Sequence, residues 1–275
     1  MPKQDVPSSI AQTFTVTKFE LLNYFRSRRF IIMLGIGVII GALLTLLVGY
    51  YRPSSFTTSS IDFYSSWWGT SAAYIVILSS IFFGGDAISG EFQNKTGYFT
   101  VGNPIRRSSI YTGKWLAAFI ASFMIIVVFV AMTVLNNFYY FGPNMPYQFV
   151  ESFLFTVLYL ISVLGLTFFF SSLFKSSSIA ILTTVVLMLF AFSLIQNLVN
   201  AFVHIEPWFL ITYGAGIIGN ILTVPYPLHT SITRFGHVAI ASYGVTVPEG
   251  VAILAIYFIV TAILGLVLFE RKEFN

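Results

Sequence analysis

Six stretches of this sequence are apolar over about the length that crosses a lipid bilayer. They cover residues 30–50, 68–85, 115–135, 152–173, 179–199 and 251–269, and none of them contains Asp, Glu, Lys, Arg or His. A helix needs roughly 20 apolar residues to span the hydrocarbon core. Charged residues make up only 9% of the chain, against about 25% in an average soluble domain. The sequence therefore predicts one all-α integral membrane domain, residues 1–275, with six transmembrane helices.

The basic residues predict how these helices are oriented. Of the 14 Lys and Arg residues, only Arg52 and Arg234 fall on one side of a six-span arrangement. The other twelve share the opposite side: Lys3, Lys18, Arg26, Arg28, Arg29, Lys95, Arg106, Arg107, Lys114, Lys175, Arg271 and Lys272. Positively charged loops stay in the cytoplasm, so both termini are predicted to be cytoplasmic. The protein is predicted to lie in the plasma membrane. Anionic membrane lipid is the expected counterpart of these bases, and nucleic acid is not.

The residues before the first apolar stretch, 13–29, predict an amphipathic helix. One face of this helix carries Phe14, Leu21, Leu22 and Phe25. Lys18 falls on the same face, where its long side chain would extend to the lipid headgroups. Arginines at the end of the segment suit an interface with anionic lipid. We therefore predict that this helix lies along the membrane surface.

A long polar segment, residues 86–114, separates the second and third apolar stretches. A turn between neighbouring helices needs only about two to eight residues. Residues 91–101 are predicted to form a short helix across the membrane surface. Asn103 and Pro104 have the residue types of an N-cap and a first helical position, which would place Arg106 in the next helix. The alternative is a charged loop whose bases only fix the orientation.

Several short motifs in this segment occur in a recognisable order. They are Asp86 and Glu91 at the end of the second span, "NKTGYFTV" at 94–101, Pro104-Ile105-Arg106, and Gly113-Lys114 at the start of the third span. Together with a basic helix before the first of six spans, this order resembles the permease subunit of ATP-binding-cassette exporters of the type-2 permease family. The resemblance covers the whole chain in topology, and its specific residues lie between Asp86 and Lys114.

The resemblance implies that residues 86–114 form a cytoplasmic coupling helix that docks into a separate ATPase. The residues implied in docking are Glu91, Phe92, Lys95, Thr96, Tyr98, Phe99 and Arg106. A homodimeric or heterodimeric permease with two copies of the ATPase is also implied. The sequence has no G-x-x-x-x-G-K-[ST] phosphate loop. This chain is therefore expected to bind no cofactor, and the partner ATPase is expected to bind ATP and Mg²⁺.

Asp86 and Glu91 are expected to form structural ion pairs rather than a catalytic pair of acids. Both lie at the membrane edge, with bases nearby and no nucleophile, and structural ion networks commonly involve such acids. We predict that Glu91 pairs with Arg28 or Arg29, which would tie the segment to the first span.

No arrangement of side chains in the sequence indicates an enzyme. HExxH, GxSxG and Cys/His patterns are absent, and such patterns carry the nucleophile, base or metal of common hydrolases. No metal site is expected, because standard ligand spacing is not matched by His204, Glu206, His229 and His237. A polytopic membrane enzyme is the less favoured alternative, beside a non-transporting assembly or sensor subunit.

The apolar stretches also bear on the source of energy. Ion-coupled transporters and proton pumps place ionisable side chains at membrane depth, and these spans have none. Energy for transport would therefore come from outside the bilayer. The candidates for lining a path for an amphipathic, lipid-like or peptide substrate are Phe168, Phe169, Phe170, Phe190 and Gln196.

Residues 200–250 are too apolar for an ordinary solvated loop. Residues 207–224 carry no charge and are followed at once by two prolines. If they crossed the membrane, the C-terminal bases would lie on the wrong side, so we predict a re-entrant outer segment buried against protein. Type-2 permeases carry such a lid, and here it would form the outer gate. Its "GAGIIG" follows no strand, so a dinucleotide site is excluded, and close packing is expected at Gly214, Gly216 and Gly219.

Gly37 and Gly41 form a G-x-x-x-G pattern in the first span. Small residues at this spacing let two membrane helices approach closely. The neighbouring helix could belong to the same chain or to a second protomer, and the sequence does not decide between them.

Overall fold

The computed structural model describes residues 8–52, 58–94, 105–227, 229–234 and 237–272. In this part of the chain, six helical segments are long and apolar enough to cross a membrane: Arg28–Tyr51, Ser60–Gln93, Arg107–Phe141, Tyr147–Leu173, Ser177–Val203 and Val247–Arg271. Each of the six predicted spans lies inside one of them. The number of predicted spans is therefore confirmed. The helices extend beyond the predictions because aromatic and polar residues at the bilayer edge continue them.

The elements follow one another along the chain with few long connections. Helix α1 (Ser9–Arg26) precedes the first span, α2 (Arg28–Tyr51), and the next two spans are α4 (Ser60–Gly84) and α7 (Arg107–Phe141), with the short α5 (Ser89–Gln93) between them. The fourth span is α8 (Tyr147–Leu173), and the fifth consists of α9 (Ser177–Val185), η1 (Val186–Ala191), α10 (Phe192–Leu198) and η2 (Val199–Val203). Then come α11 (Ile211–Ala215), α12 (Ile217–Asn220), β1 (Thr230–Arg234), β2 (His237–Ser242) and the last span, α13 (Val247–Arg271).

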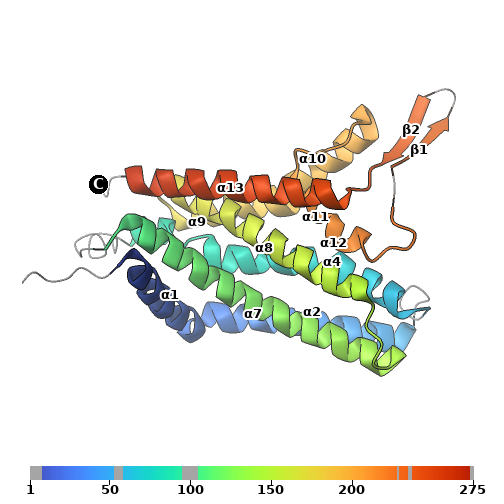
Figure 1. The fold of residues 1–275 in the computed structure, drawn as a ribbon, viewed down its shortest axis with the longest axis horizontal. Helices are drawn as coiled ribbons and strands as arrows, with labels where there is room; N and C mark the ends of the chain where they lie inside the picture. The colour runs from blue at the N-terminus through green and yellow to red at the C-terminus, as the bar shows by residue number, and fades with distance from the viewer. Residues whose placement is uncertain (1–7, 53–57, 95–104, 228, 235–236, 273–275) are drawn as a thin grey trace, which may run out of the picture.

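The spans lie side by side in alternating directions (Figure 1). Helix α1 and the C-terminal end of α13 lie at one end of the bundle, which we call the terminal end. The strands β1 and β2 project from the opposite end, which we call the hairpin end (Figure 1). The termini of the described chain therefore share one side, as the alternation of six spans requires.

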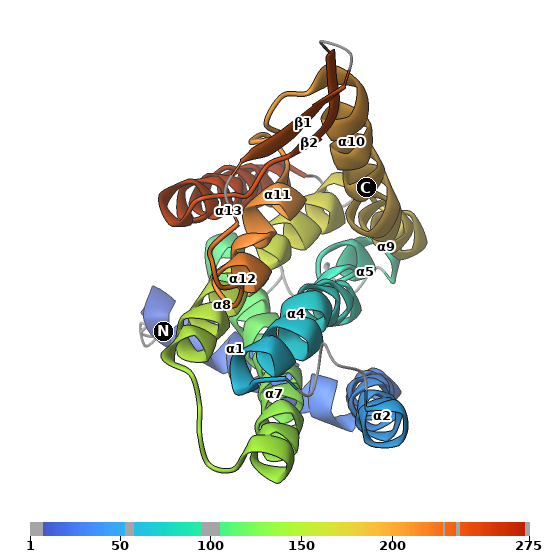
Figure 2. The ribbon, with the colours of Figure 1, turned by 90° about the vertical axis from the view of Figure 1, so that its right-hand side faces the viewer.

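Helix α4 forms the centre of the bundle (Figure 2). In the candidate span Ser60–Gln93, which begins with α4, 67% of the most apolar 18 residues are buried, against 22% for α2 and 17% for the fifth span. Its large aromatic side chains Trp67 and Trp68 are fully buried. The indole N–H of Trp68 donates to Ser152 Oγ on α8 at 3.0 Å, and Ser152 Oγ donates to the Ile218 carbonyl at 2.6 Å. These bonds satisfy polar groups where no water is at hand.

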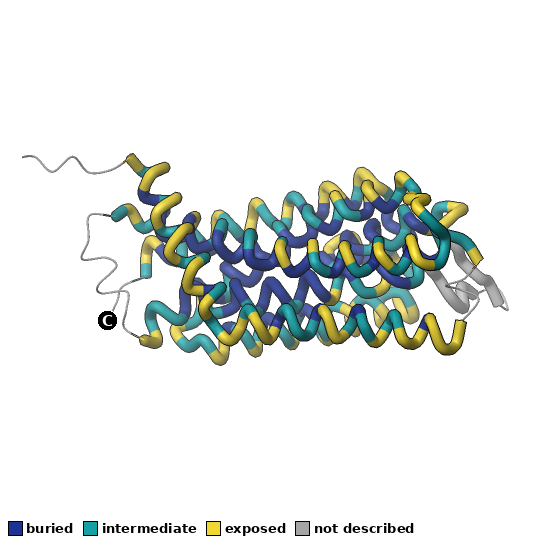
Figure 3. The backbone as a smooth tube through the Cα atoms, turned by 90° about the horizontal axis from the view of Figure 1, so that it is seen from below, coloured by how far each residue is buried: buried dark blue, intermediate teal, exposed yellow. Residues whose placement is uncertain are grey.

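The exposed residues lie on the outside of the bundle and the buried residues on its inside (Figure 3). Many of the exposed residues are large and apolar. Leu46 on α2, Leu182 on α9 and Ile256 on α13 are 60–68% exposed. Apolar patches of this extent are rare on soluble monomers. They suit the contact of a spanning helix with lipid, as expected of a multi-pass membrane protein.

The two glycines of the G-x-x-x-G pattern in α2 face α7 of the same chain. A Cβ atom added to Gly37 would lie 3.7 Å from Ile125 Cγ2, and one added to Gly41 would lie 2.6 Å from Met132 Cε. The neighbour that the sequence left open is therefore a helix of the same chain.

The segment between the fifth and sixth spans leaves and returns at the hairpin end (Figures 1 and 2). A Cβ atom on Gly214 in α11 would lie 2.9 Å from Ile253 Cγ2 of α13, and one on Gly219 in α12 would lie 3.3 Å from the Gly69 carbonyl of α4. Gly216 instead contacts its own segment, with the Tyr213 carbonyl at 3.0 Å and Val245 Cγ1 at 3.4 Å. Gly214 and Gly219 thus allow close packing on the spans.

The same segment contains a feature that the all-α prediction missed. Strands β1 and β2 pair in antiparallel fashion, from Thr230 opposite Ser242 to Arg234 opposite His237, with an irregularity after Ile232. Both strands are rich in β-branched residues, which favour extended backbone. The described chain is otherwise helical, so this short hairpin is an addition to the predicted all-α fold.

Helix α1 buries a polar face and exposes an apolar one. Gln12, Thr17 and Tyr24 are buried, whereas Phe14 and Phe19 are each 66% exposed. The Thr17 hydroxyl donates to the Gly113 carbonyl of α7 at 3.1 Å. The helix begins four residues earlier than predicted and ends at Arg26. Its polar side chains contact α7, and its outer face is apolar.

The close contact of α1 with α7 depends on Gly113. A Cβ atom there would lie 2.7 Å from Val16 Cβ and 2.9 Å from the Thr13 carbonyl, whereas nothing lies within 4 Å of the same position on Gly35. We expect Gly113→Ala to lower the free energy of unfolding by about 1–3 kcal/mol, as overpacking does. The matched variant Gly35→Ala should be neutral. Thermal unfolding in detergent checks this, and equal midpoints for the two variants would contradict it.

Candidate functional site

The short helix α5 is anchored to α8 at its first turn. The N–H groups of Ile88 and Ser89 both donate to Ser171 Oγ, each at 3.0 Å. The residue at the N-cap position of α5, Ile88, offers no side-chain acceptor of its own. A serine 83 residues away therefore supplies the cap that a local Ser or Asp usually provides.

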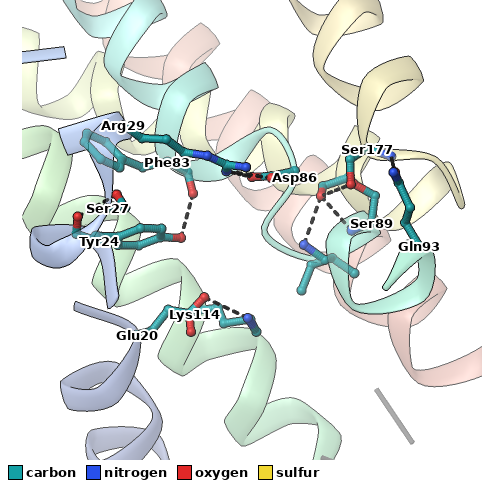
Figure 4. Close-up of polar contacts among 12 residues, drawn as sticks. Glu20, Tyr24, Ser27, Arg29, Phe83, Asp86, Ser89, Gln93, Lys114 and Ser177 are labelled. Carbon is teal, nitrogen blue, oxygen red and sulfur yellow. Dashed lines mark hydrogen bonds and ion pairs between the residues drawn. The ribbon is translucent and has the colours of Figure 1, made fainter. Parts of the chain in front are cut away.

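The last residue of α5 is bonded to the fifth span. Gln93 Oε1 accepts the Ser177 N–H at 2.7 Å (Figure 4). Ser177 is the first residue of α9, and Ser176 before it makes no side-chain cap bond. Gln93 thus satisfies one of the N–H groups that a helix start leaves open. A displacement of α5 would break this bond or move the start of the fifth span.

The ammonium of Lys114 joins three helices at one point. Its Nζ lies 2.8 Å from Glu20 Oε1 on α1 and 2.9 Å from Glu91 Oε1 on α5. Lys114 is in the second turn of α7 and its side chain is only 8% exposed. A buried charge is costly unless it is paired and hydrogen-bonded. The two carboxylates meet this need and hold α1 and α5 against α7.

A second ion pair links the first two spans. Arg29 Nη1 in the first turn of α2 lies 2.6 Å from Asp86 Oδ2, just after α4 (Figure 4). Nearby, the Tyr24 hydroxyl donates to the Phe83 carbonyl at 2.7 Å. Burial raises the pKa of Tyr24 well above its ordinary value, so the phenol keeps its proton and remains a donor.

These contacts correct the predicted partners of Glu91. Glu91 pairs with Lys114, and the arginine predicted as its partner, Arg29, pairs with Asp86. Asp86 lies beside the start of α2. Glu91, about one turn later, lies beside α7, because the chain turns in that direction after Asp86. The predicted tie to the first span exists, but Asp86 supplies it.

Phe92 and Lys272 connect α5 to the end of α13. The Phe92 ring meets the Phe269 ring edge-on at 6.4 Å, and Lys272 Nζ lies 4.3 Å from the Phe92 centroid. Lys272 Nζ also donates to the carbonyls of Ser172 and Phe174 at 2.9 and 2.8 Å. These are among the last carbonyls of α8, which a basic side chain satisfies well.

The end of α13 is capped in turn by the start of α7. Arg107 Nη1 donates to the carbonyls of Glu270 and Lys272 at 2.8 and 3.1 Å. Several helix ends at the terminal end are therefore capped by side chains from other helices. We call α5 together with Lys114, Ser171, Ser177, Phe269 and Lys272 the α5 cluster.

A polar cavity of about 590 Å³ lies next to the α5 cluster. It is bounded by α1, the start of α2, the end of α4, α5 and α7. Its lining includes the carboxylates of Glu20, Asp86 and Glu91 and the cations of Arg29 and Lys114. Among the described residues, no three His, Cys, Asp or Glu side chains gather so as to hold a metal ion. The charged side chains that line the cavity form ion pairs with one another.

The residues implied in docking on the ATPase fall into two groups. Lys95, Thr96, Tyr98 and Phe99 lie outside the described residues. Glu91 and Phe92 point into the bundle, with the partners given above. The predicted helix 91–101 is described only as far as α5, which ends at Gln93.

The start of α7 also differs from the prediction. Arg106 has extended backbone, with φ −70° and ψ 135°, and the helix begins at Arg107. Asn103 and Pro104 are therefore not its N-cap and first residue. The Arg106 N–H donates to Gln12 Oε1 of α1 at 3.1 Å. A contact with a distant helix, and not a local cap, fixes where α7 starts.

The residues suggested for a transport path do not share one surface. Phe168 is fully buried and meets the Tyr111 ring at 5.5 Å, whereas Phe190 in the fifth span is 62% exposed. Gln196 accepts a bond from Thr212 Oγ1 at 3.0 Å. Phe169 and Phe170 pack partly buried against the core.

Sequence reasoning missed Ser171, Gln93 and Lys272 as members of the α5 cluster. The available signal was weak: each is a polar residue at or next to the end of a span. Such residues are usually taken for solvated span ends. Only the packing shows that they cap neighbouring helices.

Removing the Lys114 ammonium should destabilise the terminal end more than removing the Arg29 guanidinium. Loss of one partner of a buried pair costs about 3–5 kcal/mol, and an exposed pair contributes only about 0–1 kcal/mol. Lys114 is 8% exposed and Arg29 is 51% exposed. Lys114→Met should therefore unfold at a lower temperature than Arg29→Gln, and adding Glu20→Gln to Lys114→Met should recover part of the loss. Similar midpoints for the two single variants would refute the role of Lys114.

Lys272 should make stability depend on pH above neutrality. Burial, and then the charge of Lys175, lowers the pKa of Lys272 to about 8 from its ordinary value of 10.5. Between these values the unfolded chain holds a proton that the folded chain has released, so this contribution to stability rises with pH. Wild-type protein should gain thermal stability relative to Lys272→Met between pH 7.5 and 10. A difference between the two that stays constant over this range would contradict the lowered pKa.

A family model described as "ABC-2 family transporter protein" matches residues 14–274. No curated protein matches the sequence. The matched range includes the six candidate spans and the α5 cluster, and it confirms the resemblance drawn from the motifs between Asp86 and Lys114. The chain therefore belongs to the ABC-2 transporter family and is a multi-pass membrane subunit of that family.

Proposed function

We propose that this chain is the permease of an ATP-driven exporter and that a separate ABC ATPase supplies its energy. The observation that carries this proposal is the bonding of the five-residue helix α5. Its residues contact Ser171 of α8, Ser177 of α9, Lys114 of α7 and the end of α13. A displacement of the segment that follows α5 would therefore be transmitted to four spans at once. The expected substrate is amphipathic, lipid-like or a peptide.

The segment from α5 to the start of α7 is the proposed coupling segment. Lys95, Thr96, Tyr98 and Phe99 are proposed to dock on the ATPase, because Glu91 and Phe92 are already used within the bundle. The partner would bind ATP and Mg²⁺, and two ATPase copies would serve a permease dimer. Closure of the ATPase pair would displace α5. The contacts of α5 with α8 and α9 would then transmit that displacement into the membrane.

The proposed orientation places the terminal end in the cytoplasm, with the protein in the plasma membrane. Helix α1 would lie in the interface, since its apolar outer face suits the boundary between headgroups and acyl chains. Residues 204–246 would then form the outer lid. Within it, Gly214, Gly216 and Gly219 are proposed as the outer gate, with α11 and α12 seated on α13 and α4.

A labelling experiment tests this orientation, because the chain has no cysteine. A cysteine at Asn94, which is exposed beside α5, should react with a membrane-impermeant thiol reagent only after the membrane is opened. Cysteines at Val224, which is 69% exposed, and at Ser242 should both react in intact cells. Labelling of Val224 but not Ser242 from outside would mean that the segment between them crosses the membrane.

The coupling role is tested by removing two bonds of α5. The complex of this chain with its cognate ATPase is reconstituted in proteoliposomes, with a fluorescent phospholipid and a fluorescent peptide as probes. Ser171→Ala with Gln93→Ala should leave basal ATP hydrolysis intact and lower transport per ATP at least fivefold, since coupling energies between sites are about 1–3 kcal/mol. Ser193→Ala, an exposed serine of the fifth span, is the matched control.

Two outcomes would overturn the proposal. If the wild-type complex hydrolyses ATP but moves neither probe nor any component of a lipid extract, the assembly or sensor alternative is favoured. If the double variant transports as well as the control, α5 does not carry the coupling.

A further inference from the structure

An apolar groove lies between the first half of α2 and the middle of α7. It has a volume of about 430 Å³ and is lined by Phe30 and Leu34 from α2 and by Phe123, Met124, Val127 and Val128 from α7. The two helices touch beside the groove, where Gly37 meets Ile125, and again further along, where Gly41 meets Met132. On α2, the groove residues Phe30 and Leu34 both precede Gly37 and so lie on its terminal-end side.

The groove is open on the outside of the bundle. Met124 and Val127 are 41% and 43% exposed. All six lining residues belong to candidate membrane spans, and the other four are partly buried between the two helices. The apolar side chains of this surface offer no hydrogen-bond partner to water, so water is not a favourable occupant of the groove. The chemistry of the lining therefore calls for a hydrocarbon chain.

Two arginines lie beside the groove at its terminal end. Arg26 ends α1 and Arg28 begins α2, with only Ser27 between them. The Phe25 ring meets the Phe30 ring edge-on at 4.9 Å, which places the end of α1 beside the groove. Both arginines are exposed. Unlike Arg29, neither has an ion-pair or hydrogen-bond partner among the residues that the structure describes.

We propose that this groove is a binding site for an anionic phospholipid. One acyl chain would lie along Phe30, Leu34 and Met124, and the phosphate would be bound by Arg26 and Arg28. Guanidinium groups match phosphate oxygens with paired N–H donors, and basic residues next to a membrane helix attract anionic headgroups. The site uses no residue of the α5 cluster, so this proposal does not rest on the proposed transport function.

A second copy of the chain is a less suitable occupant of the groove. A two-fold interface uses the same surface of both copies. Docking through this groove would therefore bring the arginines of both chains close to one another. A lipid phosphate removes that repulsion.

The test measures lipid retained by the full chain purified in detergent. Native mass spectrometry is carried out after addition of phosphatidylglycerol or phosphatidylcholine of the same acyl composition. Wild-type protein should retain one phosphatidylglycerol at least tenfold more strongly than phosphatidylcholine. Leu34→Trp, which fills the groove, and Arg26→Gln with Arg28→Gln should each reduce this retention at least tenfold.

Matched controls lie on the same helix. Leu46→Trp adds the same ring to a lipid-facing position that is 68% exposed, and Arg52→Gln removes an exposed arginine at the other end of α2. Both should retain the lipid as wild-type protein does. A bimane dye on Met124→Cys gives a second readout, since brominated phosphatidylglycerol should quench it more than brominated phosphatidylcholine.

Three results would overturn the proposal. Equal retention of both lipids, unaffected by the arginine variants, would remove the anionic headgroup from it. Unchanged retention in Leu34→Trp, with equal quenching at Met124, would show that the groove is not the site. Loss of a dimer in Leu34→Trp without any change in lipid would assign the groove to a second copy of the chain.

Discussion

The Lys114 ammonium is the charge on which the terminal end of this protein depends. It is almost fully buried where α7 enters the bundle, and it has two carboxylates within 2.9 Å. An unpaired charge in this place would cost several kcal/mol. Glu20 must therefore lie on one side of it and Glu91 on the other. This requirement fixes α1 and α5 against α7 before any other contact of these helices is considered.

The positions of the neighbouring spans follow from the position of α5. Ser171 caps the start of α5, and Gln93 at the end of α5 caps the start of α9. In most proteins, the residue next to a helix end supplies its cap. Here the caps come from helices distant in sequence, so each cap is also a contact between spans. Lys272 and Arg107 extend the same arrangement to the ends of α8 and α13.

The hairpin end is held by a different kind of contact. Glycines 214 and 219 bring α11 and α12 to within van der Waals distance of α13 and α4, and Ser152 joins the Trp68 indole to the Ile218 carbonyl. At the hairpin end, close backbone packing and hydrogen bonds between uncharged groups hold the helices together. The two ends of the bundle therefore differ in chemistry: ion pairs and charged caps hold the terminal end, and small residues hold the hairpin end.

The sequence by itself determined the number of spans, their approximate positions and the class of protein. Apolar stretches of about 20 residues have few alternatives to crossing a bilayer as helices, because their backbone bonds must be satisfied internally. It also located the segment between Asp86 and Lys114 that carries the family motifs. Only the tertiary structure decided that Glu91 pairs with Lys114 and that Arg29 pairs with Asp86. It also decided that Gln12 of α1 accepts the N–H of Arg106, the residue just before α7. These contacts depend on how each helix is rotated and on where the chain turns after α4, and the packing of all the spans together sets both.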